Sequence, residues 1–457
     1  MVNDAAIVIL AAGQGTRMKS KMAKVLHRAG GKALVEHAIS TALQLAPAER
    51  IFVVVGHQAE AVGAVANAAG VRSFEQRQQL GTGHAVMCGE SELAGLGGLL
   101  LVVNGDCPLV QPETLRQLVD LYKSAGAKAA LVSTDLADPT GYGRIVRAEN
   151  GDVLAIVEHK AATAEQRTIP EINAGFYCFD AEAFWKHVHE IRTDNPAGEY
   201  YLTDMIEILI RAGHRVAALK AADSSELLGI NNKVELAAVD RILRERKARD
   251  LMLDGVTILR PETVNIDAQV RVGPDTVIEP FVQITGDTVI GENCHIGTSS
   301  IIQNSHIGDN AQIHPFSVIS TSKLDDHVHV GPFARIRMGA HLHEGSHVGN
   351  FVELKNTEFG AGSKSMHLAY LGDSTIGSKV NVGAGTITCN YDGKKKHRTN
   401  IGNHAFVGSN STLVAPLTIA DEAYIAAGST ITHNVPEHSL ALGRSRQVVK
   451  VGWTPKR

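Results

Sequence analysis

The sequence predicts an α/β protein with three parts: an open, mainly parallel sheet of the Rossmann-like type, a linker helix, and a left-handed parallel β-helix of hexapeptide repeats. Three observations predict this organisation. Apolar strands alternate with helical stretches from residue 5 to about 230. A charged amphipathic stretch covers 231–255, and beyond it aliphatic residues recur every six positions. Because 457 residues exceed one ordinary core, we expect domains at 1–230 and 256–457, joined by the helix.

The first half contains continuous apolar runs of the kind expected for strands buried on both faces. These runs are "AIVIL" (6–10), "RIFVVVG" (50–56) and "GLLLVVNGD" (98–106). Between them, "ALVEHAISTALQLA" (33–46) and "PETLRQLVDLYKSAG" (112–126) carry apolar residues at helical spacing. The second helical stretch begins with proline and ends with glycine, as helix boundaries prefer. The alternation predicts a mainly parallel sheet covered by helices.

The second half is marked by one aliphatic residue in every six. Seven successive matches run from Ile266 to Ile302, the phase then slips by one, and the period resumes. An inward aliphatic residue on each flat side, often followed by glycine, is typical of a hexapeptide β-helix. Three hexapeptides make one triangular coil of about eighteen residues, and stacked coils bury a continuous aliphatic column. The predicted column comprises Ile266, Val272, Ile278, Ile284, Ile290, Ile296, Ile302, Ile307, Ile313, Ile319, Val330, Ile336, Leu342, Val348, Leu354, Ile401, Val407, Leu413, Ile419, Ile425 and Ile431.

Composition and charge argue against several classes of function. Hydrophobic residues make up 44% of the chain and the net charge is −4, so no overall attraction to nucleic acid or anionic membrane is expected. No apolar run approaches the roughly 20 residues of a membrane span, and the N-terminus lacks a signal-peptide pattern. We therefore expect a cytoplasmic protein with no nucleic-acid or membrane partner. The five cysteines, which show neither paired nor metal-binding spacing, are Cys88, Cys107, Cys178, Cys294 and Cys389.

A glycine-rich loop follows the first predicted strand, in "LAAGQGTRM" (10–18). A dinucleotide fingerprint would need glycine where Met18 stands, and a P-loop would need Gly-Lys-Ser/Thr. Two interpretations remain: a loop whose backbone N–H groups line a nucleotide phosphate, or a basic turn after a strand. The cations in and after the loop are Arg17, Lys19, Lys21 and Lys24.

This loop resembles the signature of sugar-phosphate nucleotidyltransferases, which join a sugar 1-phosphate to a nucleoside triphosphate and release pyrophosphate. In that pattern a Pro-Lys pair follows the loop, whereas this sequence has Ala23-Lys24. The resemblance covers about residues 5 to 453 and is specific to a bifunctional bacterial family that carries a uridyltransferase and an acetyltransferase in one chain. Further matching segments are "EQRQQLGTGHA" (75–85), "VVNGDCPL" (102–109), "PTGYGRI" (139–145), "IVEHKAA" (156–162), "EINAGFY" (171–177) and "GINN" (229–232).

For the first half, the resemblance implies uridylyl transfer from UTP to N-acetylglucosamine 1-phosphate. Because two anions must meet at phosphorus, charge neutralisation and in-line placement of the reactants should dominate catalysis. Mg²⁺ suits this reaction because it takes oxygen ligands and bridges phosphates. The family's metal ligands match Asp106 and Asn231, and its catalytic cations match Arg17 and Lys24. The alternatives are an Asx turn for Asp106 and a solvated surface carboxylate for Glu158. Matches to nucleotide- and sugar-binding positions are Leu10, Ala11, Ala12, Gly13, Lys24, Gln76, Gly81, Thr82, Asn104, Gly105, Asp106, Gly143, Glu158, Asn173 and Asn231.

In the second half, function must come from interruptions of the repeat, because a β-helix can be a pure scaffold. The repeat breaks at 359–400, where His367 lies. The resemblance implies that His367 is the general base that deprotonates the amine of glucosamine 1-phosphate for attack on acetyl-CoA, a role that suits an imidazole. Glu353 is the expected orienting carboxylate. Matches to substrate and acetyl-CoA positions are Arg337, Lys355, Tyr370, Asn381, Ala384, Asn390, Tyr391, Ser409, Ala427 and Arg444.

Three other stretches receive no role. The pairs "HVH" (327–329) and "HLH" (341–343) contain metal-ligating residues, but alternation along a strand also explains them. The basic run "KKKHR" (394–398) is explained by a solvated loop.

These observations favour a bifunctional enzyme of UDP-N-acetylglucosamine synthesis that acetylates first and transfers uridylyl second. The resemblance also implies a homotrimer with acetyl-CoA between neighbouring coils. One alternative is a single-activity sugar-1-phosphate nucleotidyltransferase whose β-helix has a scaffolding or regulatory role, and another is a non-enzymatic binding protein. The interruption that carries His367 and Tyr370 argues against a scaffold, which has no reason to break its own repeat there.

Overall fold

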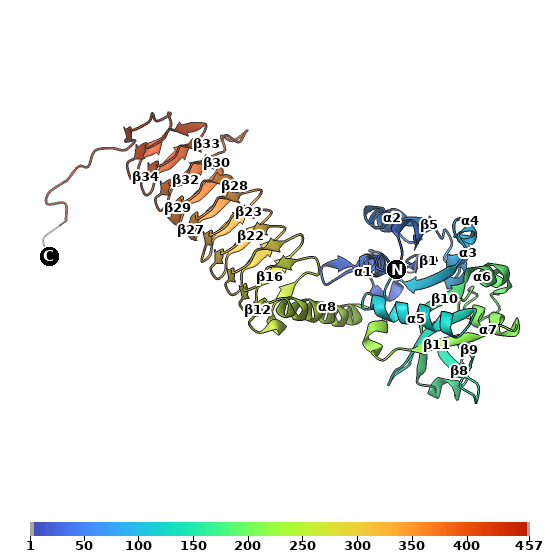
Figure 1. Ribbon diagram of the computed structural model, residues 1–457. Coiled ribbons are helices and arrows are strands. Elements are labelled where there is room, and N and C mark those ends of the chain that lie inside the picture. The colour runs from blue at the N-terminus through green and yellow to red at the C-terminus, as the bar shows by residue number, and fades with distance from the viewer. Residues whose placement is uncertain (1–3, 455–457) are drawn as a thin grey trace. The chain divides into compact units, whose positions relative to one another are not determined.

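The computed structural model describes residues 4–454 (Figure 1). The chain divides into two compact units, Met1–Leu243 and Arg244–Arg457, and the division falls inside the long helix α8 (Lys233–Leu253). This helix corresponds to the one expected at 231–255. Within 4–454, no helix combines the length and apolar character that crossing a membrane requires.

The first unit is built on a mixed, mainly parallel sheet with the strand order β11-β7-β10-β6-β1-β4-β5. The three predicted apolar strands are confirmed as β1, β4 and β6, and β1 pairs in parallel with both of the others. β10 is antiparallel to β6, β7 and β8, and β8 forms a further antiparallel pair with β9 at the side of the sheet. The strands are β1 (Ala5–Leu10), β4 (Ile51–Val55), β5 (Arg72–Glu75), β6 (Leu99–Asn104), β7 (Ala129–Asp135), β8 (Arg144–Arg147), β9 (Val153–Val157), β10 (Glu171–Asp180) and β11 (Val216–Lys220).

Helices cover both faces of this sheet, so each strand buries alternate residues in two different cores. Along β1, Ile7 and Ile9 pack with α1, α2 and α5, whereas Val8 packs with α3, α6 and α7. The helix expected at 33–46 ends earlier, at Ala42, because the chain turns before Pro47. The helices are α1 (Leu34–Ala42), α2 (Ala59–Ala68), α3 (Thr82–Met87), α4 (Glu90–Leu93), α5 (Pro112–Ser124), α6 (Ala181–His187) and α7 (Asp204–Arg211).

The second unit is the predicted left-handed β-helix, made of short parallel strands stacked coil upon coil (Figure 1). Neighbouring coils pair 18 residues apart, as Gln283 beside Ile301, or 17 apart, as His306 beside Lys323. The phase slip in the sequence is therefore one residue lost from a coil. The aliphatic column is buried throughout, apart from the half-buried Val272, and the last turns of α8 add Ala248 and Leu251 to the same core.

The interruption at 359–400 is a change of coil shape, and the stack of coils continues through it. Two seven-residue strands, β28 and β30, pair along their length across it. The offset then rises to 25 residues, with Asn381 beside Phe406, because a loop is inserted between β32 and β33. The strands of this region are β23 (Lys323–Leu324), β24 (His329–Val330), β25 (Arg335–Arg337), β26 (His341–Leu342), β27 (His347–Asn350), β28 (Glu353–Phe359), β29 (Lys364–His367), β30 (Tyr370–Ile376), β31 (Asn381–Val382), β32 (Ile387–Cys389), β33 (Thr399–Ile401), β34 (Phe406–Val407) and β37 (Tyr424–Ile425).

Candidate active sites

The glycine-rich loop after β1 lines a cavity of about 500 Å³ at the carboxyl end of the sheet. Gly15 has φ 62°, and a Cβ at this position would lie only 2.5 Å from the Cβ of Lys24. Glycine therefore lets the lysine pack directly against the loop. The predicted residues that line this cavity are Leu10, Ala11, Ala12, Gly13, Lys24, Gln76, Gly81, Thr82, Asn104 and Asp106.

Four polar side chains from distant segments meet beside this cavity. Lys24 forms an ion pair with the Oδ2 of Asp106, just beyond the end of β6. The same Nζ lies 3.4 Å from the Oδ1 of Asn231, which also accepts a 2.8 Å hydrogen bond from Arg17. Asn231 is held at the start of α8 because its backbone N–H donates to Glu235 at 2.6 Å. The structure thus brings together the two predicted metal ligands and the two predicted cations.

This oxygen pair fits a hard divalent cation. The Oδ2 of Asp106 and the Oδ1 of Asn231 both face the ammonium of Lys24, so the two oxygens converge on one position that a positive group can occupy. Carboxylate and amide oxygens are donors that Mg²⁺ accepts, and it uses few protein ligands when phosphates complete its shell.

The end of β6 allows close backbone approach to the cavity. The backbone N–H of Gly105 donates to the carbonyl of Leu10 at 3.0 Å, and a Cβ at residue 105 would lie 2.9 Å from that oxygen. Asn104 donates at 3.4 Å to the carbonyl of Ala174 in β10. These contacts fix the backbone at the rim of the cavity, where Asp106 follows directly after Gly105.

The segment at 75–85 forms another wall of the cavity. Gln76 is buried and its Nε2 donates to the carbonyl of Gly81 at 2.9 Å. Gly81 precedes α3 with φ 110°, where a Cβ would meet the backbone oxygen of Tyr200 at 2.5 Å. Thr82 accepts a 3.1 Å hydrogen bond from the backbone of Leu202. An amide side chain and a tight backbone turn are therefore fixed at the cavity wall.

The three predicted sugar-binding residues form a separate group beside β8, β9 and β10. The carbonyl of Gly143 accepts from the backbone N–H of Asn173 at 2.9 Å, and Glu158 lies next to Gly143. Burial raises the pKa of Glu158, while a 3.4 Å hydrogen bond from Thr203 opposes the shift. These residues do not line the 500 Å³ cavity, but the half-buried carboxylate of Glu158 differs from the solvated one considered from the sequence.

In the second unit, His367 ends β29 and is exposed. Its Nδ1 lies 2.8 Å from the Oδ1 of Asn350 on the preceding coil, to which it is paired in register. An amide oxygen only accepts, so this contact places the proton on Nδ1 and leaves the Nε2 lone pair free. The ring is therefore in the tautomer that a general base needs.

Glu353, the carboxylate expected to orient His367, makes other contacts in the structure. Glu353 accepts a 2.6 Å hydrogen bond from the Nε of Arg337 and pairs in register with Tyr370. The reason is the register: β27 brings Asn350 beside His367, and Glu353 begins the next strand, β28. Asn350 takes the orienting position that the sequence assigned to a carboxylate.

A buried aspartate in β30, Asp373, organises a second set of polar residues. The Oδ2 of Asp373 accepts from the Nζ of Lys355 at 3.0 Å and from Asn390, whose amide also lies 3.4 Å from the Oη of Tyr370. Burial raises the pKa of Asp373, but hydrogen bonds from Asn356 and Lys355 outweigh it and hold this pKa below its usual range. The predicted residues Lys355, Tyr370 and Asn390 are thus one connected group.

Small residues continue the column of coils beyond His367. By the register of β29, β31, β34 and β37, the residues that occupy the position of His367 in the following coils are Ala384, Ser409 and Ala427. The carbonyls of Asn350, Ala384 and Ser409 each accept a backbone hydrogen bond from the next coil, at 3.0, 2.7 and 2.8 Å. Ala384, Ser409 and Ala427 thus form a track of short side chains on successive coils. Of the other predicted residues, Asn381 pairs with Lys364, Arg444 lies beside Gly428, and Tyr391 is exposed and donates to the carbonyl of Gly393.

Several site residues were missed from the sequence. Asn350 and Asp373 were missed because outward positions of a hexapeptide carry no periodic signal. Thr16 and Gly15 lie inside the quoted loop and could have been included with it. The cavity is also lined by the unpredicted Gln14, Gly15, Thr16, Val25, Gln79, Ala85 and Glu199.

The fold and cavity of the first unit are those of a nucleotidyltransferase, and comparison with protein families agrees. The MobA-like NTP transferase domain matches residues 7–173, and the GMPPB C-terminal domain matches residues 260–433.

Full-length relatives make the assignment more specific. The bifunctional protein GlmU of Solibacter usitatus (strain Ellin6076) is 58% identical over 451 residues, which cover 99% of this chain and 97% of the relative. The GlmU proteins of Koribacter versatilis (strain Ellin345) and Geotalea uraniireducens (strain Rf4) are each 46% identical, over 99% and 100% of this chain and 97% and 100% of their own lengths. The chain belongs to the bifunctional GlmU family. It is an enzyme with acetyltransferase and uridyltransferase activities in UDP-N-acetylglucosamine synthesis, which confirms the predicted function.

Proposed function

We propose that residues 1–230 carry the uridyltransferase, residues 256–457 the acetyltransferase, and that 231–255 links them. The acetyltransferase acts first, on glucosamine 1-phosphate and acetyl-CoA. The uridyltransferase then joins the N-acetylglucosamine 1-phosphate to UTP and releases pyrophosphate. The convergence of Arg17, Lys24, Asp106 and Asn231 beside the glycine-lined cavity is the observation that carries the proposal.

In the first site, Asp106 and Asn231 would hold Mg²⁺, and Arg17 and Lys24 would bind the triphosphate. When bound, Mg²⁺ supplies neutralisation of the phosphate charges. Lys24 now pairs with Asp106; its flexible ammonium can turn to a phosphate oxygen when a cation takes the carboxylate. The sugar phosphate is already anionic, so this step needs no protein base, and placement together with charge supplies the rate enhancement.

Specificity in this site would come from two groups. Gln76, Gly81 and Thr82 form the wall that faces the nucleotide base, with the amide of Gln76 fixed by the carbonyl of Gly81. Glu158, Asn173 and Gly143 would read the acetamido group and hydroxyls of the sugar. Burial raises the pKa of Glu158, which is the expected cost of keeping a carboxylate ready to accept from sugar N–H and O–H groups.

In the second site, the Nε2 of His367 would accept a proton from the substrate amine as the nitrogen attacks the thioester carbonyl. The C–N bond forms as the C–S bond breaks, and coenzyme A leaves as a thiolate that the imidazolium can protonate. Asn350 holds the ring in the required tautomer. Arg337 and Lys355 would bind the sugar phosphate, and Tyr370, Asn390 and Tyr391 would line the substrate. Acetyl-CoA would lie along Ala384, Ser409 and Ala427, with Asn381 and Arg444 beside it, because these short side chains leave room for an extended chain.

A homotrimer would place a neighbouring chain against this track. Its support is a ladder of exposed apolar side chains, Phe316, Phe333, Phe351 and Leu368, at one corner of successive coils. Contiguous exposed apolar surface of this kind marks interaction sites. The mass in solution, measured by light scattering, should be three times the chain mass of 48.7 kDa; a monomeric mass would contradict the proposal. The five free cysteines support a reducing, cytoplasmic location.

Two assays test the proposed chemistry. With UTP, Mg²⁺ and N-acetylglucosamine 1-phosphate, the protein should release pyrophosphate, and omission of Mg²⁺ should stop it. With acetyl-CoA and glucosamine 1-phosphate, it should release free thiol, followed with a thiol reagent. Pyrophosphate release without a divalent metal, or no thiol release, would contradict the corresponding half of the proposal.

A further inference from the structure

The histidine pair at 341–343 belongs to a cluster that has no role in either proposed site. His341 and His343 flank the fully buried Leu342 on β26, so strand alternation places both rings on the outer face of one coil. The register stacks β26 between β23 and β28. Asp325, just after β23, and Glu358, within β28, therefore lie on the coils on either side of the two histidines.

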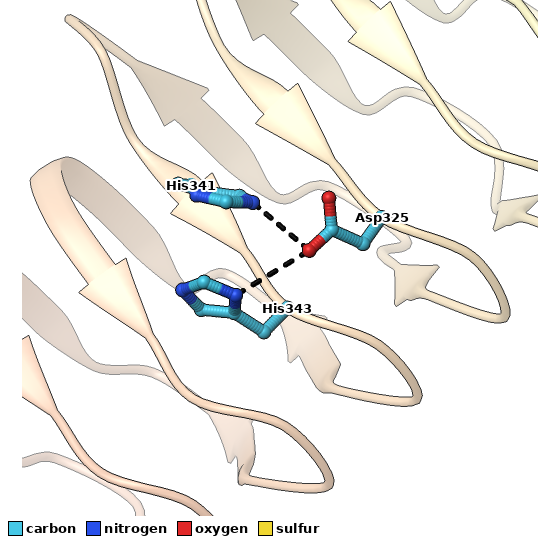
Figure 2. Close-up of side chains that lie close together, drawn as sticks. All are labelled: Asp325, His341 and His343. Atoms are coloured by element: carbon cyan, nitrogen blue, oxygen red, sulfur yellow. Dashed lines mark hydrogen bonds and ion pairs between the residues drawn. The ribbon is translucent and has the colours of Figure 1, made fainter.

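Both imidazole rings face one oxygen of Asp325 (Figure 2). Its Oδ2 lies 3.0 Å from the Nε2 of His341 and 3.3 Å from the Nδ1 of His343. Lys323 pairs with the other oxygen, Oδ1, at 2.9 Å. The carboxylate is therefore held so that it presents a single oxygen to the two nitrogens.

The other nitrogen of each ring faces Glu358. Its Oε2 lies 3.4 Å from the Nδ1 of His341 and 3.0 Å from the Nε2 of His343. Each imidazole is thus placed between two carboxylates. A neutral imidazole carries only one N–H, so two of these four contacts would set a nitrogen lone pair against a carboxylate oxygen unless both rings were protonated.

A metal ion resolves this conflict. We propose that Asp325, His341 and His343 bind a divalent transition-metal ion of the Zn²⁺ type. The two nitrogens that face Asp325 supply lone pairs to the ion, while the two that face Glu358 keep their protons and donate to it. A carboxylate that accepts from the outer nitrogen of a metal-binding histidine is a common supporting arrangement, and here one glutamate serves both rings.

The distances agree with this assignment. Ligand atoms about 2.1 Å from a tetrahedral zinc ion lie about 3.4 Å from one another, and the measured separations from the Asp325 oxygen are 3.0 and 3.3 Å. Two imidazole nitrogens and one carboxylate oxygen favour zinc or a neighbouring transition metal over Mg²⁺ or Ca²⁺, which prefer oxygen. Within the described residues 4–454, this is the only group of three such side chains whose ligand atoms all lie within 4.8 Å.

The ion would join consecutive coils, since Asp325 and the histidines come from coils that are paired at β23 and β26. Glu358 extends the link to a third coil through β28. The site is distinct from Asp106 and from His367, so neither activity should require it. Its expected effect is on the stability of the β-helix, because an ion that binds only the folded state stabilises that state.

The test uses the full-length protein, which is stripped of metal with a chelator and dialysed into buffer with saturating Mg²⁺, so that the Asp106 site stays filled. Zn²⁺ is then the only metal titrated. Wild type should bind one Zn²⁺ per chain with a raised thermal midpoint. His343→Ala and Asp325→Asn should each weaken this binding at least 100-fold and abolish the thermal shift. The matched control is His329→Ala, from the other histidine pair. The ring of His329 contacts those of His314 and His347 and, among the described residues, pairs with no carboxylate.

Both catalytic activities report whether each variant is folded. If His343→Ala does not fold, Asp325→Asn, which keeps the side-chain volume, carries the comparison. X-ray absorption of the zinc-loaded wild type should show two imidazole ligands. Equal zinc binding by wild type and both site variants, a loss in His329→Ala as large as in His343→Ala, or no stoichiometric binding by wild type would each overturn the proposal.

Discussion

The two candidate sites of this chain are assembled in opposite ways. In the first unit, side chains very distant in sequence meet at the ends of buried strands: Arg17 and Asn231 form a hydrogen bond across 214 positions. In the second, His367 and Asn350 meet across 17 positions, which is one coil. The first site depends on the topology of a whole sheet, whereas the second depends on the register between adjacent coils. The two sites should therefore fail independently when single residues are replaced.

The largest expected effect is the loss of acetyl transfer in His367→Ala. Removal of a general base costs about 10²–10⁴-fold, and this exposed side chain supports no core packing. Thiol release from acetyl-CoA should fall by this factor while pyrophosphate release from UTP stays at the wild-type rate. A folded variant that loses both activities would show that the two sites are coupled.

The reciprocal experiment is Asp106→Ala. Loss of groups that support a metal ligand costs about 10–100-fold, so loss of the ligand itself should lower uridylyl transfer at least about 100-fold. Acetyl transfer should be unchanged. Pyrophosphate release is the measurement, with Asp106→Asn as the control that keeps shape; a variant with normal pyrophosphate release would remove Asp106 from the proposed metal site.

Asn350 sharpens the comparison within the second unit. Asn350→Ala frees the His367 ring, and we expect kcat for acetyl transfer to fall about 10–100-fold, with a smaller change in KM. Asn350→Asp should recover part of the rate and move the acidic limb of the pH–rate profile to higher pH, because a carboxylate stabilises the protonated ring. The comparison variant is Glu353→Ala. If it alone impairs kcat and Asn350→Ala does not, the orienting role returns to Glu353.

Glu158→Gln tests whether this carboxylate lowers the stability of the first unit while it improves binding of the sugar. Replacement of a charged acceptor by a neutral one should raise the KM for N-acetylglucosamine 1-phosphate about tenfold. Burial raises the pKa of Glu158, so wild-type stability falls as pH rises from the ordinary glutamate pKa through the raised one.

Glu158→Gln has no ionisable side chain at this position, so it avoids that loss of stability at high pH. Its thermal midpoint should therefore exceed that of wild type at pH 8, and this difference should shrink toward pH 4, where the carboxyl is mostly protonated in both states. A variant less stable at pH 8, with an unchanged KM, would place Glu158 in a structural role.

The smallest effect is expected at Ala23, where the family pattern has proline. Ala23 has φ −55°, which suits proline, but its backbone N–H donates to the Oε1 of Gln58 at 2.8 Å. Ala23→Pro would gain about 0.4–1 kcal/mol from a less flexible unfolded chain and lose a hydrogen bond worth about 0.5–1.5 kcal/mol. We expect a change in unfolding free energy below about 1 kcal/mol, measured by denaturant titration. A clear stabilisation would show that the contact with Gln58 contributes little.

Sequence alone predicted much of the fold because both halves carry a strong hydrophobic pattern. Continuous apolar runs identified β1, β4 and β6, and the six-residue period identified the buried column of the β-helix. The sequence predicted helix ends and strand directions less well, because these depend on tertiary packing and leave no periodic pattern. Residues 43–46 continue the helical apolar spacing but lie beyond the end of α1, and the antiparallel pairing of β10 within a parallel sheet has no local signal.

What the sequence determined, then, is which residues face inward: periodicity is a property of the chain, and burial of apolar side chains enforces it. Which outward side chains meet was decided by the tertiary structure. The register between coils placed Asn350, not Glu353, against His367, and closed His341 and His343 around Asp325. The physical reason is that contacts between coils depend on whether the offset is 17, 18 or 25 residues, and only the stacked structure fixes that offset.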